Sequence, residues 1–177
     1  ALHQDPELSF QEFHTSSFIE QLLHQFGNIE VDRPTRTGVV ATIRGTKSGS
    51  IKRLGIRADI DALPLPEKTD LPFASQNPGV MHACGHDGHT AILLALAKIL
   101  VADRDNFCGE VRLIFQHAEE HPPGGAIELV KAGVVDGLDA MLGLHLSTNW
   151  QTGVFGIKTG ALTAAVDRFD IALEGKG

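Results

Sequence analysis

Apolar residues recur along the chain with two spacings, one typical of helices and one typical of buried strands. The first helix is predicted to begin at Asp5-Pro6-Glu7, where a capping residue, a proline and an acid follow one another, and to end near Gly27. Two more helices are predicted over 90–102 and 125–132. Short apolar or alternating runs predict strands over 38–43, 54–58, 110–116, 140–146, 154–158 and 169–173.

The alternation of helices and strands predicts an α/β fold. We expect a layered domain with a central, mainly parallel mixed sheet and helices on both faces. The segment 63–79 is rich in proline and is expected to be an irregular loop. The pattern at 169–173 predicts the first strand of a second, smaller α+β domain, so residues 1–164 are assigned to the first domain and 165–177 to the second.

The composition argues against several classes of protein. A hydrophobic content of 42% over 177 residues is enough for a packed core, and the net charge of -7 argues against a nucleic-acid-binding surface. No apolar run reaches the roughly 18 residues that span a membrane, and the polar start does not resemble a signal peptide. Cys84 and Cys108 could pair, but Cys84 lies among metal-type ligands, so we expect reduced thiols and a cytoplasmic protein.

Four clusters of chemically active side chains fall at the end of a predicted strand or the start of a helix. The carboxyl ends of strands form the binding edge of an open α/β sheet, so we expect the four clusters to converge there. They are 57–64 with Asp59 and Asp61, 81–90 with Cys84 and His86, 115–120 with Glu119 and Glu120, and 143–146 with His145.

The segment 81–90 carries the strongest signal, because three histidines, one cysteine and one aspartate lie among glycines within ten residues. We therefore interpret Cys84 and His86 as metal ligands. The other clusters have simpler explanations when each is taken alone. His145 could be a packed core residue, the glutamate pair could be solvated surface charges, and the aspartate pair could cap a turn.

Taken together, these side chains suit a divalent transition metal such as Zn²⁺, Mn²⁺, Co²⁺ or Ni²⁺. A thiolate can bridge two metal ions, and paired ions can hold an attacking water and a developing oxyanion. Consecutive glutamates would supply one metal ligand and one general base for that water. The residue types thus predict metal-assisted hydrolysis of an amide or an ester.

The same segments, in the same order, resemble the motifs of the M20 metallopeptidase family. The resemblance is to its amidohydrolase branch, which contains aminoacylase-like N-acyl-amino-acid amidohydrolases, hippurate hydrolases and auxin-conjugate hydrolases. It implies metal-dependent hydrolysis of the amide bond of N-acyl amino acids. The motifs that carry it are 3–12, 57–64, 81–90, 115–120 and 143–145, which together run over nearly all of the chain.

The resemblance also implies roles for particular residues. The family's ligands for two divalent metal ions, Mn²⁺ or Zn²⁺ with Co²⁺ or Ni²⁺ as alternatives, fall on Cys84, His86, Glu120 and His145. The general base falls on Glu119. Asp61 matches an aspartate that orients a metal ligand, with Asp59 as its neighbour. The resemblance assigns no substrate-binding residue.

Some residues that the family uses would come later than Gly177. They are one histidine ligand and a histidine that the lid domain contributes across a homodimer. The segment 175–177 resembles the beginning of this lid and dimerisation domain. We therefore expect residues 1–177 alone to be inactive, and we expect a homodimer or larger oligomer formed through the lid.

Two positions depart from the family pattern. His117 stands where proline is usual, and His121-Pro122-Pro123 stands where glycines are usual. Both histidines flank the glutamate pair, so they could alter substrate fit or supply an additional ligand. The simpler explanation is tolerated variation in a loop.

Three alternatives to an N-acyl-amino-acid amidohydrolase remain open. A cysteine hydrolase would use Cys84 as its nucleophile and His86 or His89 as its base. A dipeptidase, or a deacetylase of an amino sugar or a diaminopimelate precursor, would use the same metal chemistry on another substrate. A catalytically silent relative would keep the cluster only as a metal-binding site.

Overall fold

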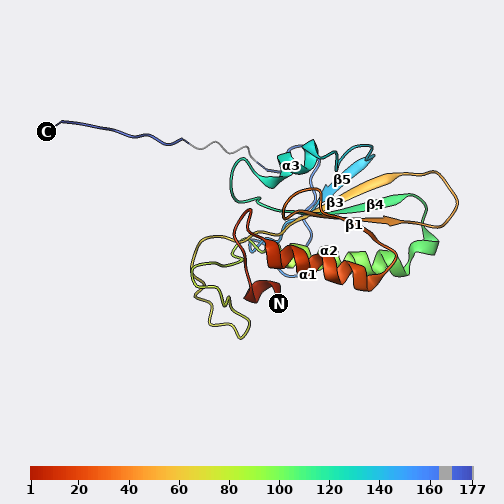
Figure 1. Cartoon of the computed structure of the whole chain (residues 1–177), viewed down its shortest axis with the longest axis horizontal. Coiled ribbons are helices and arrows are strands. Elements are labelled where there is room, and N and C mark those ends of the chain that lie inside the picture. The colour runs from red at the N-terminus through yellow and green to blue at the C-terminus, as the bar shows by residue number, and fades with distance from the viewer. Residues whose placement is uncertain (164–168, 177) are drawn as a thin grey trace. The chain divides into compact units, whose positions relative to one another are not determined.

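The computed structural model describes residues 1–163 and 169–176. The chain divides into two units, residues 1–146 and residues 147–177. All the helices and strands in the described part belong to the first unit (Figure 1). Among the described residues, no helix is both long and apolar enough to cross a membrane.

A five-stranded mixed sheet forms the centre of the first unit, with the strand order β1-β2-β4-β3-β5. The strands are β1 (Glu30–Asp32), β2 (Val39–Arg44), β3 (Arg53–Asp59), β4 (Glu110–Gln116) and β5 (Ala140–Gly143). β3 runs parallel to β4 and β5, whereas β1–β2 and β2–β4 are antiparallel pairs. The predicted mixed sheet is confirmed, but its pairings are evenly divided rather than mainly parallel.

Helices cover both faces of the sheet, as predicted (Figure 1). They are α1 (Phe13–Phe26), α2 (His86–Ala102) and α3 (Gly125–Lys131), and short 3-10 helices lie at Leu2–Gln4 and Arg104–Asn106. Side chains of β4 alternate between the two faces. Leu113 and Phe115 pack in the cluster that contains α1 and α2, while Ile114 packs with Leu129 of α3.

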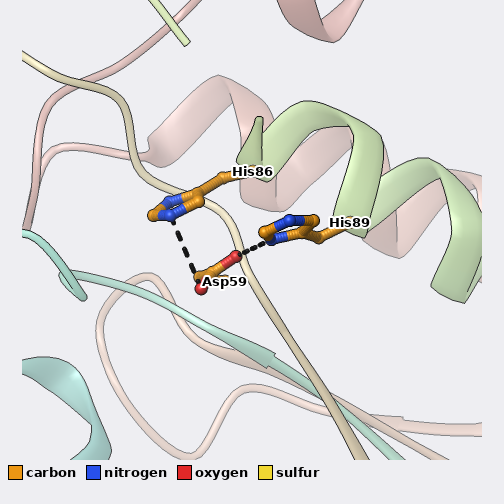
Figure 2. Close-up of side chains that lie close together, drawn as sticks. All are labelled: Asp59, His86 and His89. Atoms are coloured by element: carbon orange, nitrogen blue, oxygen red, sulfur yellow. Dashed lines mark hydrogen bonds and ion pairs between the residues drawn. The ribbon is translucent and has the colours of Figure 1, made fainter. Parts of the chain in front are cut away.

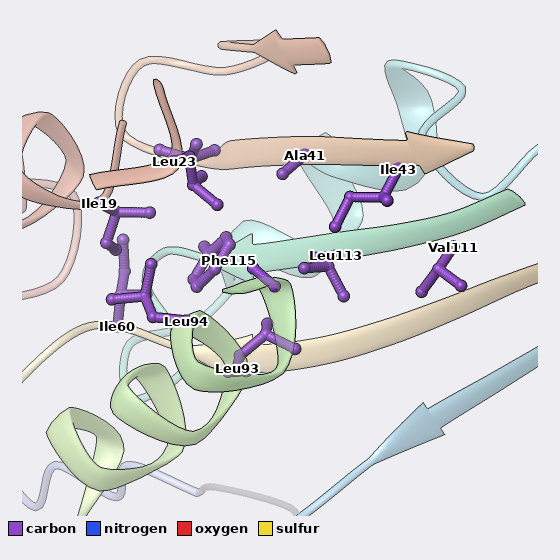
Figure 3. Packing of buried hydrophobic residues seen from close by; sticks show 13 residues of the cluster. Ile19, Leu23, Ala41, Ile43, Ile60, Leu93, Leu94, Val111, Leu113 and Phe115 are labelled. Carbon is purple, nitrogen blue, oxygen red and sulfur yellow. The ribbon is translucent and has the colours of Figure 1, made fainter. Parts of the chain in front are cut away.

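The larger core lies between the sheet and helices α1 and α2 (Figure 3). Ile19 and Leu23 on α1 and Leu93 on α2 are fully buried. Near the start of α2, the hydroxyl of Thr90 donates a hydrogen bond of 3.0 Å to the carbonyl oxygen of Asp59. The core and this hydrogen bond together hold the first turn of α2 against the end of β3.

The carboxyl ends of β3, β4 and β5 lie at one edge of the sheet. Asp59 at the end of β3 is opposite Gln116 at the end of β4, and Arg57 is opposite Gly143 at the end of β5. Parallel strands bring the segments that follow them to a common edge. The segments that follow these three strands are the ones that carry the predicted site residues.

α1 begins later than the predicted start at Asp5. The segment before it makes tertiary contacts instead: the carbonyl oxygen of Glu7 accepts a hydrogen bond of 2.8 Å from the amide of Ala62. The carboxylate of Glu7 accepts hydrogen bonds from the amides of His14 and Thr15, in the first turn of α1. Glu7 therefore caps the helix from outside it, and contacts distant in sequence replace the first predicted turns.

α2 begins at His86 rather than at Thr90, so its first turn lies within the segment that was expected to be a loop. Gly85 precedes the helix with a φ of 81°, a left-handed conformation that glycine adopts without steric strain. His86 and His89 are consequently neighbours on the first turn of the helix.

Two predicted strands are not formed, because 154–158 and 169–173 have no strand partner in the described part of the chain. Phe155 and Ile171 are 91% and 84% exposed. A strand depends on its neighbour for backbone hydrogen bonds, which an apolar pattern alone does not supply. The predicted domain boundary falls on residues 164–168, outside the described residues, so it stays a prediction.

The remaining segments agree with the sequence-based expectations only in part. The segment 63–79 is irregular, as expected, and only an isolated bridge joins Leu63 to Met81. β5 ends at Gly143 instead of continuing to Leu146. The three-residue strand β1 was not predicted, because it is too short to show a period of its own.

Replacing Ile19 with Ala should lower the free energy of unfolding by about 2–5 kcal/mol, because the side chain is fully buried and its removal leaves a cavity. Ile99→Ala is the matched control, since Ile99 lies on α2 and is 62% exposed. We expect its effect to stay within about 0.5 kcal/mol. Urea denaturation measures both values, and equal losses would contradict the packing of α1 described above.

Candidate metal centre

The predicted site residues come from four segments that meet at the carboxyl edge of the sheet. Cys84 and His86 lie at the start of α2, Asp61 follows β3, Glu119 and Glu120 follow β4, and His145 follows β5. The predicted convergence of the four segments therefore matches the fold. How close each side chain comes to the others differs from residue to residue.

Three potential ligand atoms converge on one point. Those of Cys84, His86 and Glu120 all lie within 4.8 Å of one another. Nε2 of His86 is 3.7 Å from Oε1 of Glu120, and both atoms are buried without a hydrogen-bond partner in the described part of the chain. Buried polar atoms are normally paired, because leaving them unpaired costs free energy. A divalent metal ion would satisfy both atoms together with the thiolate, so the residues present fit such an ion.

Asp61 orients the ring of His86. Nδ1 of His86 lies 2.9 Å from the carbonyl oxygen of Asp61 and 3.2 Å from its Oδ1. Both of these atoms are acceptors, so Nδ1 carries the proton and Nε2 keeps its lone pair. That lone pair faces Cys84 and Glu120, which is the orientation that a metal ligand needs.

The carboxylate of Asp61 is itself held by several donors. The hydroxyl of Ser9 donates to Oδ2 at 2.6 Å, and the amide of Glu120 donates to the same atom at 3.0 Å. Burial opposes ionisation of Asp61, but these hydrogen bonds and the one from His86 outweigh it and lower its pKa to about 2. Asp61 is therefore a fixed negative charge that joins α2 to the segment after β4.

Excess negative charge surrounds the three ligand atoms. Burial raises the pKa of the Cys84 thiol, and the carboxylates of Glu120, Glu119 and Asp59 contribute to a value of about 12. Burial together with the charges of Glu120 and Asp59 also raises the pKa of Glu119. Burial disfavours a charged His86, yet the neighbouring carboxylates raise its pKa as well. A cation at this point would offset the negative charge of these carboxylates.

A second pair of side chains, His89 on α2 and Asp59 at the end of β3, also joins these two elements (Figure 2). Nδ1 of His89 lies 2.5 Å from Oδ1 of Asp59, and the backbone amide of Leu146 donates to Nε2 of His89 at 2.9 Å. The ligand atoms of Asp59, His86 and His89 also lie within 4.8 Å of one another. Both ring nitrogens of His89 are already engaged, however, so this group is better suited to support than to metal binding. Arg57 completes it with an ion pair to Asp59 at 2.7 Å.

His145 is the one predicted ligand that the fold brings near without placing it in a ligand group of the described residues. Its ring centroid lies 5.0 Å from that of His89, and the residue is exposed. The next residue, Leu146, is tied to His89 through its amide. His89 thus holds the segment that carries His145 at the edge of the site.

The other histidines lie in varied surroundings. Nδ1 of His3 lies 2.8 Å from a carboxylate oxygen of Asp87, and its Nε2 lies 3.2 Å from one of Glu67. His14 and His24 are exposed. Another histidine of the segment 81–90, His82, is buried, and burial lowers its pKa to about 4. It belongs to neither ligand group among the described residues.

The two departures from the family pattern lie in different surroundings. His117 is buried, and its Nε2 lies 2.9 Å from a carboxylate oxygen of Glu128 on α3, so its ring is engaged away from the ligand group. His121 is exposed and lines a cavity of about 390 Å³. That cavity is otherwise mostly apolar and also borders Glu120, with Leu8 and Phe10 among its lining residues.

The contact between Asp59 and His89 was not predicted, because Asp59 had no definite role and His89 was named only as a possible base of a cysteine hydrolase. The spacing of the residues nevertheless contained a signal for this contact. Asp59 and Asp61 are two apart in an extended segment and therefore face the same way, while His86 and His89 are three apart on a helix. Two such pairs on neighbouring elements can meet side chain to side chain.

The chain is similar to proteins of known family over almost its whole length. It is 53% identical to an N-acyl-L-amino acid amidohydrolase of Geobacillus stearothermophilus, over 99% of this chain and 47% of that protein. It is 51% identical to an N-acetyl-L-cysteine deacetylase of Bacillus subtilis, over 99% of this chain and 42% of that protein. The chain thus spans less than half the length of these curated relatives.

The fold is also similar to that of a solved structure. The crystal structure of a dinuclear metal-binding peptidase of the M20 family from Bacillus subtilis is 45% identical and matches with a TM-score of 0.84. The match covers 90% of this chain and 44% of that one. Residues 55–174 match peptidase family M20/M25/M40. The chain therefore belongs to the M20 peptidase family.

Proposed function

We propose that the protein hydrolyses the amide bond of N-acyl amino acids with the help of two divalent metal ions. The observation that carries this proposal is a pair of buried atoms beside Cys84, His86 Nε2 and Glu120 Oε1, neither of which has a hydrogen-bond partner among the described residues. Glu119 lies next to Glu120 in the chain. The names of the two curated relatives supply the substrate class. Because the chain spans less than half the length of these relatives, the full reaction is proposed for a protein of their length.

Cys84, His86 and Glu120 would supply ligands for the two metal ions. His145 and a histidine from outside the 177 residues would complete the set. Mn²⁺ or Zn²⁺ fits this mixture of thiolate, imidazole and carboxylate, and Co²⁺ or Ni²⁺ would also be accepted. When bound, the ions would polarise the amide carbonyl and favour ionisation of the attacking water. Asp61 would keep His86 in the ligating orientation throughout.

Glu119 is the proposed general base. Its carboxylate is 4.0 Å from Nε2 of His86, and its side chain is 42% exposed, so substrate and water can reach it. Burial and the charge of Glu120 raise its pKa, which makes it a stronger base than an ordinary glutamate. It would take a proton from the water that attacks the acyl carbon and deliver it to the nitrogen of the departing amino acid.

The cavity that borders Glu120 is proposed to receive part of the substrate. Its lining is mostly apolar, including Leu8, Phe10 and Leu63, and its volume of about 390 Å³ can hold a small acyl group.

The proposal also includes a lid domain and a homodimer, which rest on the family resemblance alone. Dipeptides, N-acetylated amino sugars and N-acetylated diaminopimelate precursors remain rival substrates for the same chemistry.

The cysteine hydrolase is less well supported. A cysteine nucleophile needs a lowered pKa, but burial and the carboxylates around Cys84 raise its pKa to about 12. No such conflict arises for a metal ligand, because a bound cation stabilises the thiolate directly.

We expect the full-length protein to release free amino acid from N-acetyl, N-benzoyl or longer N-acyl amino acids. Chelation should abolish this activity, and added Mn²⁺ or Zn²⁺ should restore it. The panel of acyl groups measures the preference, with dipeptides as the comparison series. Activity that survives chelation but is lost on thiol alkylation would instead identify Cys84 as the nucleophile.

Glu119→Gln should lower kcat by about 10²- to 10⁴-fold while bound metal stays unchanged, because the amide cannot accept the proton from water. Cys84→Ser should instead reduce the bound metal. Glu20→Gln on α1, where Glu20 pairs with Arg33 at 3.0 Å, is the matched control and should leave both quantities unchanged. Turnover together with metal analysis measures them. Near-normal turnover of Glu119→Gln would rule out this general base.

A further inference from the structure

Glu12 is a fully buried carboxylate that has no part in the proposed chemistry. Its Oε1 accepts hydrogen bonds from the amide of Phe10 at 3.0 Å and from the amide of Ala118 at 2.8 Å. Its Oε2 accepts a hydrogen bond of 2.7 Å from the hydroxyl of Thr37. One side chain therefore joins three segments that are far apart in sequence.

Helix capping does not account for this arrangement. Glu12 precedes α1 directly, but the first amides of the helix, those of His14 and Thr15, are bound by Glu7 instead. A buried carboxylate has a large desolvation cost, and burial indeed raises the pKa of Glu12. Its contact with Ala118 is the one that reaches the candidate site.

Ala118 lies immediately before Glu119 and has an uncommon backbone conformation. Its φ is 48°, in the left-handed region that residues other than glycine rarely occupy. Its amide is bound by Glu12, and its carbonyl oxygen accepts a hydrogen bond of 3.0 Å from the amide of Gly125. Such conformations persist where the surroundings hold them, and they cluster at functional sites. These two hydrogen bonds hold the turn on both sides of Ala118.

The same N-terminal segment also supports the other end of the turn. Oδ2 of Asp61 accepts hydrogen bonds from the hydroxyl of Ser9 and from the amide of Glu120. Ser9 thus acts on the turn through Asp61, and Glu12 acts on it directly. Together they fix the backbone before and after Glu119, whose own side chain remains exposed.

We infer that Glu12 is a positioning residue for Glu119, because it holds Ala118 in the left-handed conformation that aims the Glu119 carboxylate at the attacking water. This inference rests on the function proposed above. Glu12 itself does not touch the reacting atoms. Its loss should therefore lower the rate of the chemical step and leave metal binding and substrate binding in place.

Glu12→Met and Glu12→Gln separate this role from simple packing. The methionine matches the length of the side chain but accepts no comparable hydrogen bond. The glutamine keeps an oxygen for the amides of Phe10 and Ala118, and the hydroxyl of Thr37 can accept from its NH₂ group. We expect Glu12→Met to lower kcat by about 10- to 100-fold at unchanged KM and metal content, and Glu12→Gln to stay within about threefold of the wild type.

Glu7→Met is the matched control. Glu7 lies in the same segment and also binds two backbone amides, but those amides belong to α1. We expect this variant to unfold more easily, with an unchanged kcat for each metal-loaded molecule. If Glu12→Met behaves in the same way, its role is structural only and the inference is overturned.

A double variant tests the conformation itself. Glycine adopts positive φ without strain, so Ala118→Gly should restore part of the lost kcat when it is added to Glu12→Met. No recovery would argue against a role through Ala118. If Glu12→Met does not fold, Glu12→Asp gives the same test, because its shorter side chain keeps the acceptor but draws it away from the amide of Ala118.

Hydrogen exchange of residues 117–121, followed by mass spectrometry, provides a readout that does not depend on activity. We expect faster exchange in Glu12→Met than in Glu12→Gln, Glu7→Met or the wild type. Equal exchange rates would overturn the inference. If the wild type shows no chelator-sensitive hydrolysis, the proposed function fails, and the exchange rates still decide whether Glu12 holds the turn.

Discussion

Repulsion among carboxylates is the constraint on which the candidate site depends. Oxygen atoms of Asp59, Glu119 and Glu120 lie 3.5, 4.0 and 3.7 Å from Nε2 of His86. Burial and the charges of Glu120 and Asp59 raise the pKa of Glu119. Such repulsion between carboxylates opposes folding of the edge unless positive charge lies among them. Arg57 supplies part of it through its ion pair with Asp59. A bound cation would supply the rest, so metal binding would be coupled to the order of this edge.

The layers of the fold could be predicted because their apolar residues follow a local period. β4 was predicted in full from 110–116, and its alternating side chains pack on helices at both faces. The start of α1 could not be predicted in this way, because Glu7 binds the first turn from outside the helix. The segments 154–158 and 169–173 have a strand-like pattern but no strand partner in the described part of the chain. Local patterns therefore predicted the core elements better than the segments that depend on distant contacts.

Much of the site could be predicted because its signal is also local: Cys84 and His86 lie close together in the sequence. Their meeting with Glu120 required only that the segments after parallel strands share an edge. The link between Asp59 and His89 depends on how α2 packs across the end of β3, and no local pattern contains that information. The role of Glu12 was hidden for a similar reason, because Ala118 is far from it in the sequence.

The pKa of the Cys84 thiol has a consequence for the chemical durability of the protein. Thiols react with oxidants and alkylating agents as thiolates, and a group with a pKa of about 12 is almost entirely protonated at neutral pH. Burial and the carboxylates that would attract the metal therefore also suppress thiolate formation whenever the metal is lost. In a metal-free molecule, Cys84 should react with such agents more slowly than an ordinary thiol.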